Sequence, residues 1–160
     1  MKKLVLVVVV FVFLFAVVGT AIAKGKSGAA GKSNVGHLYL YEKDPSNWAI
    51  VPDGAWGKMK YNLSGPTFNF VFNGHALEPS TSYTLIYYLD PWPGHGMCLG
   101  NAMSNEGGNV HIAGSVNTGT LEGAKIWLVL SSDVNCTAKT MTAWQPTEYL
   151  FENNVISYTP

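Results

Sequence analysis

Residues 68–89 read FNFVFNGHALEPSTSYTLIYYL and contain two strand patterns separated by a short polar interruption. Phe68, Phe70 and Phe72 recur at every second position, a period that places three rings on one face of a β-strand. Residues 83–89 are apolar at both alternate sets of positions, which is typical of a central strand covered on both faces. The stretch therefore predicts a strand, a bent crossing and a second strand, an arrangement that lets two sheets share one core.

The alternation Leu77, Pro79, Thr81, Tyr83, Leu85 resembles the tyrosine corner of fibronectin type III and immunoglobulin-like sandwiches. In those domains the Tyr hydroxyl bonds to upstream backbone, so the resemblance implies this role for Tyr83. It also implies a single Greek-key antiparallel β-sandwich of about seven to nine strands. The resemblance covers only Leu77 to Leu85 and brings no functional residue with it. A hairpin turn at Asn73-Gly74 is the alternative, because that dipeptide tolerates positive φ angles, but Pro79 would truncate the returning strand.

Strand patterns recur through the rest of the chain, and from residue 36 onward no stretch keeps a helical period, so we expect an all-β fold. Met59, Tyr61 and Leu63 alternate with polar residues and are predicted to share the phenylalanine face. The segment 131–145 is polar and irregular. Further strands are predicted at residues 37–41, 48–51, 110–116 and 124–130, and residues 149–151 and 155–158 are expected at a sheet edge.

The N-terminus has the pattern of a secretory signal peptide. Lys2 and Lys3 precede an unbroken apolar run, and Ala21-Ile22-Ala23 matches a signal-peptidase site. We expect a signal helix over residues 1–23 with cleavage after Ala23, a flexible Gly/Ser/Lys spacer over residues 24–35 and one β-sandwich domain over residues 36–160. An uncleaved membrane anchor is the alternative, and it would be the only contact with a membrane. Either way, the domain is predicted to lie outside the cytoplasm.

Charge argues against nucleic acid as a partner. The chain has 10 basic residues, all of them Lys, against 10 acidic ones. Nucleic-acid binding needs clustered cations and favours Arg for bidentate contacts. An extracellular protein or a polysaccharide surface is the expected partner.

Cys98 and Cys136 are the two cysteines, and an even count in a secreted chain predicts a disulfide between them. The alternative is a blue-copper site, for which His75, Cys98 and His111 come in a workable order. No Met or second His follows Cys98 at the close spacing of that family. We therefore expect no metal centre.

Catalytic signatures are absent from the sequence, since it contains no GxSxG, HExxH or P-loop motif and its four histidines are isolated from one another. A small secreted hydrolase with an acid pair such as Asp90 and Asp133 is the alternative, but nothing selects that pair. Calcium could be held by loops around Asp90, Glu106 or Asp133, although no EF-hand supports it. We expect neither catalysis nor a cofactor.

Two functions fit these features. The first is a secreted or cell-surface structural and interaction module, and the chain as a whole resembles small secreted β-domains of microbial surface proteins. The second is a carbohydrate-binding module in which Trp92, held between two prolines in the loop from Asp90 to Gly96, stacks on a sugar while Asp90 or His95 bonds its hydroxyls. A glycosylation sequon at Asn62 lies on the predicted outward face of its strand.

Overall fold

The computed structural model of this chain describes residues 33–88 and 97–160, and most of them are in strands. β1 to β7 span Val35–Tyr41, Trp56–Asn62, Phe68–His75, Ser82–Tyr88, Met97–Met103, Val110–Val116 and Leu121–Leu130. The 3-10 helix η1 (Ser131–Asp133), β8 (Val134–Asn135), β9 (Thr140–Met141), the 3-10 helix η2 (Pro146–Glu148), β10 (Leu150–Glu152) and β11 (Ile156–Tyr158) follow. Within the described residues no helix has the length and hydropathy to cross a membrane. The predicted signal peptide lies outside them.

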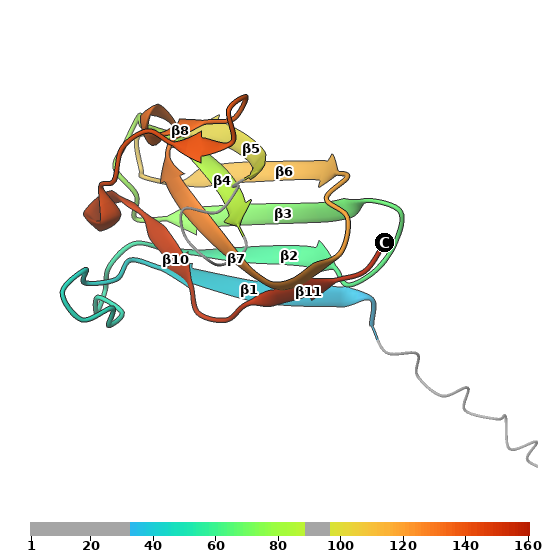
Figure 1. Ribbon diagram of the computed structural model, residues 1–160. Coiled ribbons are helices and arrows are strands. Elements are labelled where there is room, and N and C mark those ends of the chain that lie inside the picture. The colour runs from blue at the N-terminus through green and yellow to red at the C-terminus, as the bar shows by residue number, and fades with distance from the viewer. Residues whose placement is uncertain (1–32, 89–96) are drawn as a thin grey trace, which may run out of the picture. The chain divides into compact units, whose positions relative to one another are not determined.

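Nine of the described strands form one antiparallel sheet that nearly closes into a barrel, and β8 and β9 pair separately with each other. Its order is β5-β4-β7-β10-β1-β2-β3-β6, with β11 paired to β7. Figure 1 shows β7 crossing in front of β2 and β3 as the sheet curls over itself. The strands at the two ends of the order, β5 and β6, come into contact. Gly100 permits this approach, because a Cβ atom there would lie 2.9 Å from Ile112 Cγ2.

The all-β class and the antiparallel pairing agree with the prediction, whereas the arrangement of the strands differs from two facing sheets. The strand responsible is β10, in which Phe151 pairs with Trp127 of β7 on one side and with Tyr41 of β1 on the other. Residues 149–151 were expected at a sheet edge, and this expectation is wrong. Because β10 lies between β7 and β1, hydrogen bonding runs unbroken from β5 to β6.

The main core fills the inside of the curled sheet. Phe68, Phe70 and Phe72 are buried as their spacing predicts, and Met59 and Tyr61 pair with Phe72 and Phe70 across β2 and β3. Leu63 does not join them. β2 ends at Asn62, and the Leu63 side chain is exposed in the turn that follows.

The crossing between β3 and β4 is present. β3 runs through Asn73 and Gly74 to His75, so the alternative hairpin turn at that dipeptide is wrong. β3 pairs with β2 and β6, whereas β4 pairs with β5 and β7, so residues 76–81 lead from one part of the sheet to another. The Tyr83 hydroxyl accepts a hydrogen bond from the Glu78 backbone N–H at 3.3 Å, as the tyrosine-corner resemblance implies.

A second hydrophobic cluster lies on the outer face of β4, β7 and β10. The apolar residues on both faces of β4 and β7 predicted that both faces are buried. The main core buries the inner face, and the segment 131–149 packs over the outer face. The cluster contains Ile86, Tyr88, Trp127, Val129, Tyr149 and Phe151. Cys98 of β5 packs against it and forms the predicted disulfide with Cys136 of the covering segment. This pair is consistent with an extracellular location.

Residues 48–51 do not form the predicted strand. The backbone of Trp48 has a φ of 59°, in the left-handed region, and only Ile50 makes an isolated bridge, to Lys43. The segment is part of the loop between β1 and β2. The turn residues that precede it continue to determine the backbone through Trp48, so a strand cannot begin there.

Candidate functional site

A pocket of about 490 Å³ opens on the outer face of the sheet, beside the second cluster. Its walls are mostly aromatic, and three of the four tryptophans in the described part of the chain line it. A small number of charged groups lie among the rings. The lining residues are Lys43, Trp48, Tyr88, Lys125, Trp127, Trp144, Phe151 and Glu152. A concave, mainly apolar site with a few polar groups is the usual form of a small-ligand pocket.

The floor of the pocket consists of ring pairs on neighbouring strands. Trp127 and Phe151 are register partners on β7 and β10, and their rings meet edge to face with centroids 5.1 Å apart. Tyr88 of β4 packs on the other side of Trp127 at 4.4 Å. Such edge-to-face contacts favour a fixed ring geometry, so the floor is rigid.

Trp48 forms one wall, and the turn before it sets its position. The Asp44 carboxylate accepts a hydrogen bond from the Ser46 N–H at 2.8 Å, which lowers the pKa of Asp44, and the Asn47 side chain accepts one from the Ala49 N–H at 2.8 Å. Between them the Trp48 N–H donates to the Asp44 carbonyl at 2.7 Å. A bulky residue at positive φ is a strained arrangement that is often found at functional sites.

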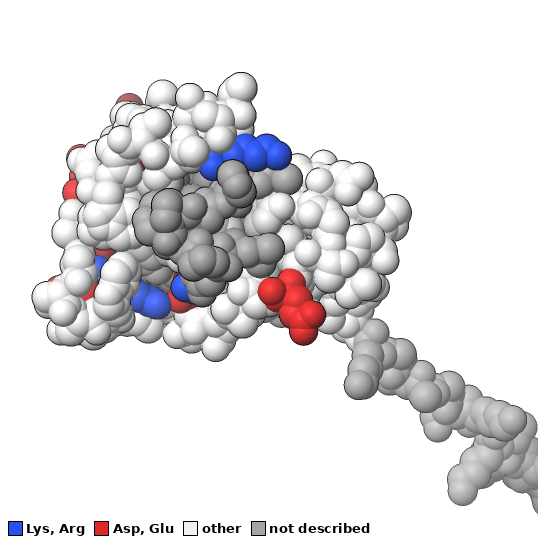
Figure 2. Space-filling view, in the orientation of Figure 1, with Lys and Arg blue, Asp and Glu red and all other residues white. Residues whose placement is uncertain are grey.

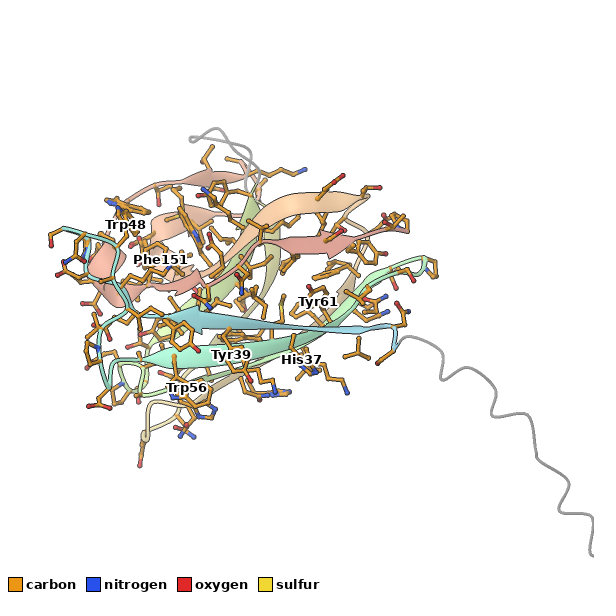
Figure 3. All side chains as sticks on the ribbon, turned by 90° about the horizontal axis from the view of Figure 1, so that it is seen from below. His37, Tyr39, Trp48, Trp56, Tyr61 and Phe151 are labelled. Atoms are coloured by element: carbon orange, nitrogen blue, oxygen red, sulfur yellow. A yellow bond between two sulfur atoms is a disulfide. The ribbon has the colours of Figure 1, made fainter. Side chains whose placement is uncertain are left out.

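The Trp48 indole meets the Phe151 ring edge to face at 5.2 Å and is still 50% exposed. Figure 3 shows the two side chains together at one end of β1. The loop thus holds a large apolar ring at the mouth of the pocket, where a ligand can reach it.

Trp144 forms another wall and comes from the segment 131–149. Its ring lies 5.6 Å from the rings of Trp127 and Tyr149, and it is 46% exposed. Like Trp48, it presents one side to the cluster and the other to solvent.

A buried carboxylate holds the segment that carries Trp144. Asp133 is 2% exposed, and its oxygens accept hydrogen bonds from the Tyr149 hydroxyl at 2.5 Å and from the Gln145 side-chain amide at 2.9 Å. Its backbone carbonyl accepts from the Thr142 N–H at 2.8 Å. These bonds tie η1 to residues on both sides of Trp144. Burial, followed by the hydrogen bond with Asp133, raises the pKa of Tyr149 far above its usual range.

Charged groups of both signs lie at the rim. The Lys43 ammonium donates to the Glu152 carbonyl at 2.8 Å, and Lys125 lies over the Tyr88 ring at 5.4 Å. The Glu152 carboxyl has a hydrogen bond with Trp127, while its buried Oε2 has no partner among the described residues. Burial raises the pKa of Glu152, and the two lysines offset part of that effect.

Replacing Glu152 by Gln is expected to raise the free energy of unfolding at about pH 7 and to leave it nearly unchanged at about pH 3. The pKa of the folded carboxyl lies above that of the unfolded chain, so stability is fully present below the unfolded pKa and is lost as the pH rises through the folded one. Gln keeps the shape without the charge. Urea unfolding at both pH values measures the difference, and a variant less stable than wild type at the higher pH would contradict it.

No family model, curated protein or solved structure matches this chain. Its function therefore has to be inferred from the chemistry of the pocket.

Trp92, Asp90 and His95, the residues predicted for ligand binding, lie outside the described residues. Tyr88, which directly precedes their loop, lines the pocket. The sequence reasoning missed Trp48 and Trp144, because one was read as strand and the other lies in a segment without period. A tryptophan within the polar segment 131–145 was the one signal that pointed to an exposed aromatic site.

The other predicted sites differ from the pocket in position and role. Cys98 is in the disulfide, so it is not a copper ligand, while His75 and His111 bond to Asn109 and Asn73. Asp133 is buried, and its oxygens accept hydrogen bonds from Gln145 and Tyr149. Among the described residues no group of three potential metal ligands comes together.

Asn62 is only partly exposed, and its side chain stabilises the turn after β2. Its amide nitrogen donates to the carbonyls of Ser64 and Thr67, both at 2.9 Å, and its oxygen accepts from the Asn69 N–H at 2.7 Å. A glycan on this nitrogen would replace one of the two donated hydrogen bonds.

Proposed function

We propose that this protein is a secreted, non-catalytic interaction module that binds carbohydrate in the aromatic pocket. The observation that supports this most strongly is the pair of half-exposed indoles, Trp48 and Trp144, which line one pocket and pack against the aromatic rings of its floor. A sugar ring has apolar C–H faces and a polar edge of hydroxyls. It therefore matches a site with aromatic walls and polar groups at the rim.

The rim supplies the hydrogen-bonding groups that such a ligand needs. Lys43 and Lys125 offer ammonium donors, each of which can serve more than one acceptor. A flat contact with a protein partner would not need a concave site of this depth. Figure 2 shows blue and red side chains scattered among uncharged ones on the face it presents, and the described residues visible there form no extended cationic patch for nucleic acid.

The Greek-key relation to immunoglobulin-like domains and the cell-surface location remain parts of the proposal. The disulfide supports export, because such bonds persist in oxidising compartments. Trp92 remains predicted to add a further stacking ring from the loop that follows Tyr88.

Trp48→Ala and Trp144→Ala are each expected to raise the dissociation constant for the bound saccharide at least about fivefold, which corresponds to about 1 kcal/mol, the lower end of what a nucleobase stacked on an aromatic side chain contributes. The probes are cellulose, xylan, chitin, mannan, starch and pectin, tested by sedimentation and then by calorimetry with soluble fragments of whichever binds. Both positions are exposed, so folding should be retained, and far-UV circular dichroism checks this.

Met103→Ala is the matched control, because Met103 is an exposed apolar residue of β5 that does not line the pocket. Trp92→Ala, measured beside it, tests the loop prediction. If the wild type binds none of the six polysaccharides, or if both tryptophan variants bind as the wild type does, the proposed function is wrong. The search would then move to protein partners.

A further inference from the structure

The aromatic surface does not end at the pocket. On the outer face of the sheet, one cross-strand row of register partners runs through Trp127, Phe151, Tyr41, Trp56 and His75. These residues belong to β7, β10, β1, β2 and β3 in turn. Neighbouring strands are about 4.8 Å apart, so Trp56 lies about 10 Å along the row from Phe151.

A second cavity, of about 400 Å³, follows this row beyond the pocket. We call it the Trp56 groove. Tyr41 and Trp56 form its floor on the sheet, and residues 50–54 and Ala76 form its sides. None of its residues lines the first pocket.

The groove presents the Trp56 ring in a fixed orientation. The ring packs against His75 with centroids 4.6 Å apart, and the His75 ring nitrogen is bonded to Asn109 at 2.8 Å. Trp56 is nevertheless 38% exposed. On the same face Tyr39 stacks near Tyr41 at 6.3 Å, and Figure 3 shows Tyr39 and Trp56 on the outer side of β1 and β2.

One loop borders both cavities. The segment 42–55 contributes Lys43 and Trp48 to the pocket and residues 50–54 to the groove. Its base is closed by Glu42, whose carboxylate accepts from the Ala55 N–H at 2.9 Å and whose backbone N–H donates to the Ala55 carbonyl at 2.8 Å. A single row of rings and a single bordering loop make the two cavities one continuous surface.

We infer that the Trp56 groove is a second subsite for the same ligand, so that the protein recognises a chain of linked sugars rather than one terminal sugar. The inference rests on the proposed function. The pocket holds one sugar ring against Trp48 and Trp144, and the next units follow the row over Tyr41 to Trp56.

The test uses cello-, xylo-, chito-, manno-, malto- and galacturono-oligosaccharides, from the monosaccharide to the hexasaccharide, titrated calorimetrically into the full oxidised protein. In the wild type, affinity is expected to rise with chain length. Trp56→Ala should weaken binding of the hexasaccharide at least about fivefold and leave the shortest bound member unchanged. Trp48→Ala should weaken the binding of oligosaccharides of every length.

Trp56→Phe should restore most of the length dependence, because it keeps an aromatic face. Val71→Ala, an exposed apolar change on the same face outside the groove, should bind like the wild type. If Trp56→Ala binds oligosaccharides of every length as tightly as the wild type does, while Trp48→Ala binds them more weakly, the second subsite is wrong and the proposed function stands. If no oligosaccharide of any length binds the wild type, both are wrong.

Discussion

Replacing Cys98 and Cys136 together by Ser is expected to lower the free energy of unfolding by about 4 kcal/mol. The bond closes a loop with a sequence separation of 38, and in the chain-entropy model its loss frees the unfolded chain by that amount. It also joins β5 to the segment 131–149, which covers the second cluster. Urea unfolding of the oxidised wild type and of the double variant measures the change.

Wild-type protein reduced before denaturation provides the matched comparison and should unfold at the same urea concentration as the double variant. The disulfide contributes one side of the cover that positions Trp144, so saccharide binding should weaken in both samples. A loss below about 1 kcal/mol would show that the cover is held without the bond.

Asp133→Ala is expected to lower the free energy of unfolding by about 3 kcal/mol, because it leaves the Tyr149 hydroxyl and the Gln145 amide without their buried acceptor. The segment 131–149 should loosen, and ligand affinity should fall with it although Asp133 does not line the pocket. Chemical unfolding and calorimetric titration of the same preparation measure the two effects. Asp133→Asn keeps one acceptor oxygen, so its free energy of unfolding and its ligand affinity should both fall less than those of Asp133→Ala.

The same network makes the fold sensitive to alkali. The pKa of Tyr149 is higher in the folded protein than in the unfolded chain. The contribution of its neutral hydroxyl to the free energy of unfolding is therefore complete below about pH 10 and is lost as the pH rises further. Phe at position 149 cannot ionise, so Tyr149→Phe should lose less of its free energy of unfolding between about pH 10 and higher pH than the wild type does.

For Asp133→Ala, a ligand affinity equal to that of the wild type would contradict the link between the hydrogen-bond network and the pocket.

Local periods were enough to predict most of the long strands and the main core, although residues 48–51 were wrongly predicted as a strand. Phe68, Phe70 and Phe72 repeat every second residue, and β4 and β7 are apolar on both faces, so each of these strands could be placed from its own sequence. The crossing at Pro79 and Tyr83 was equally local, as was the pairing of the only two cysteines.

Strand order could not be predicted this way, because it depends on which distant segments pair. β10 has only three residues, yet it joins β7 to β1 and turns the expected two sheets into one. The cover of the outer face was also beyond local reasoning. It depends on Asp133, whose partners lie 12 and 16 residues farther along an irregular segment.

The candidate site was the least predictable part, since it combines two loops with a strand floor. The hypothesis of a stacking tryptophan was directed to Trp92 because two prolines flank it. The backbone at Trp48 is also constrained, but by the hydrogen bonds of the Asp44 and Asn47 side chains and by its own left-handed conformation. No flanking proline makes this constraint visible in the sequence.

The positions of the tryptophans determine which part of this protein intrinsic fluorescence monitors. None of the described tryptophans belongs to the main core, whose large rings are all Phe and Tyr. Trp48, Trp127 and Trp144 surround the pocket instead, and Trp56 lies in the groove. Fluorescence emission from these four tryptophans therefore follows the outer layer and any sugar that enters it, while loss of the barrel interior has to be followed through the tyrosines or the backbone.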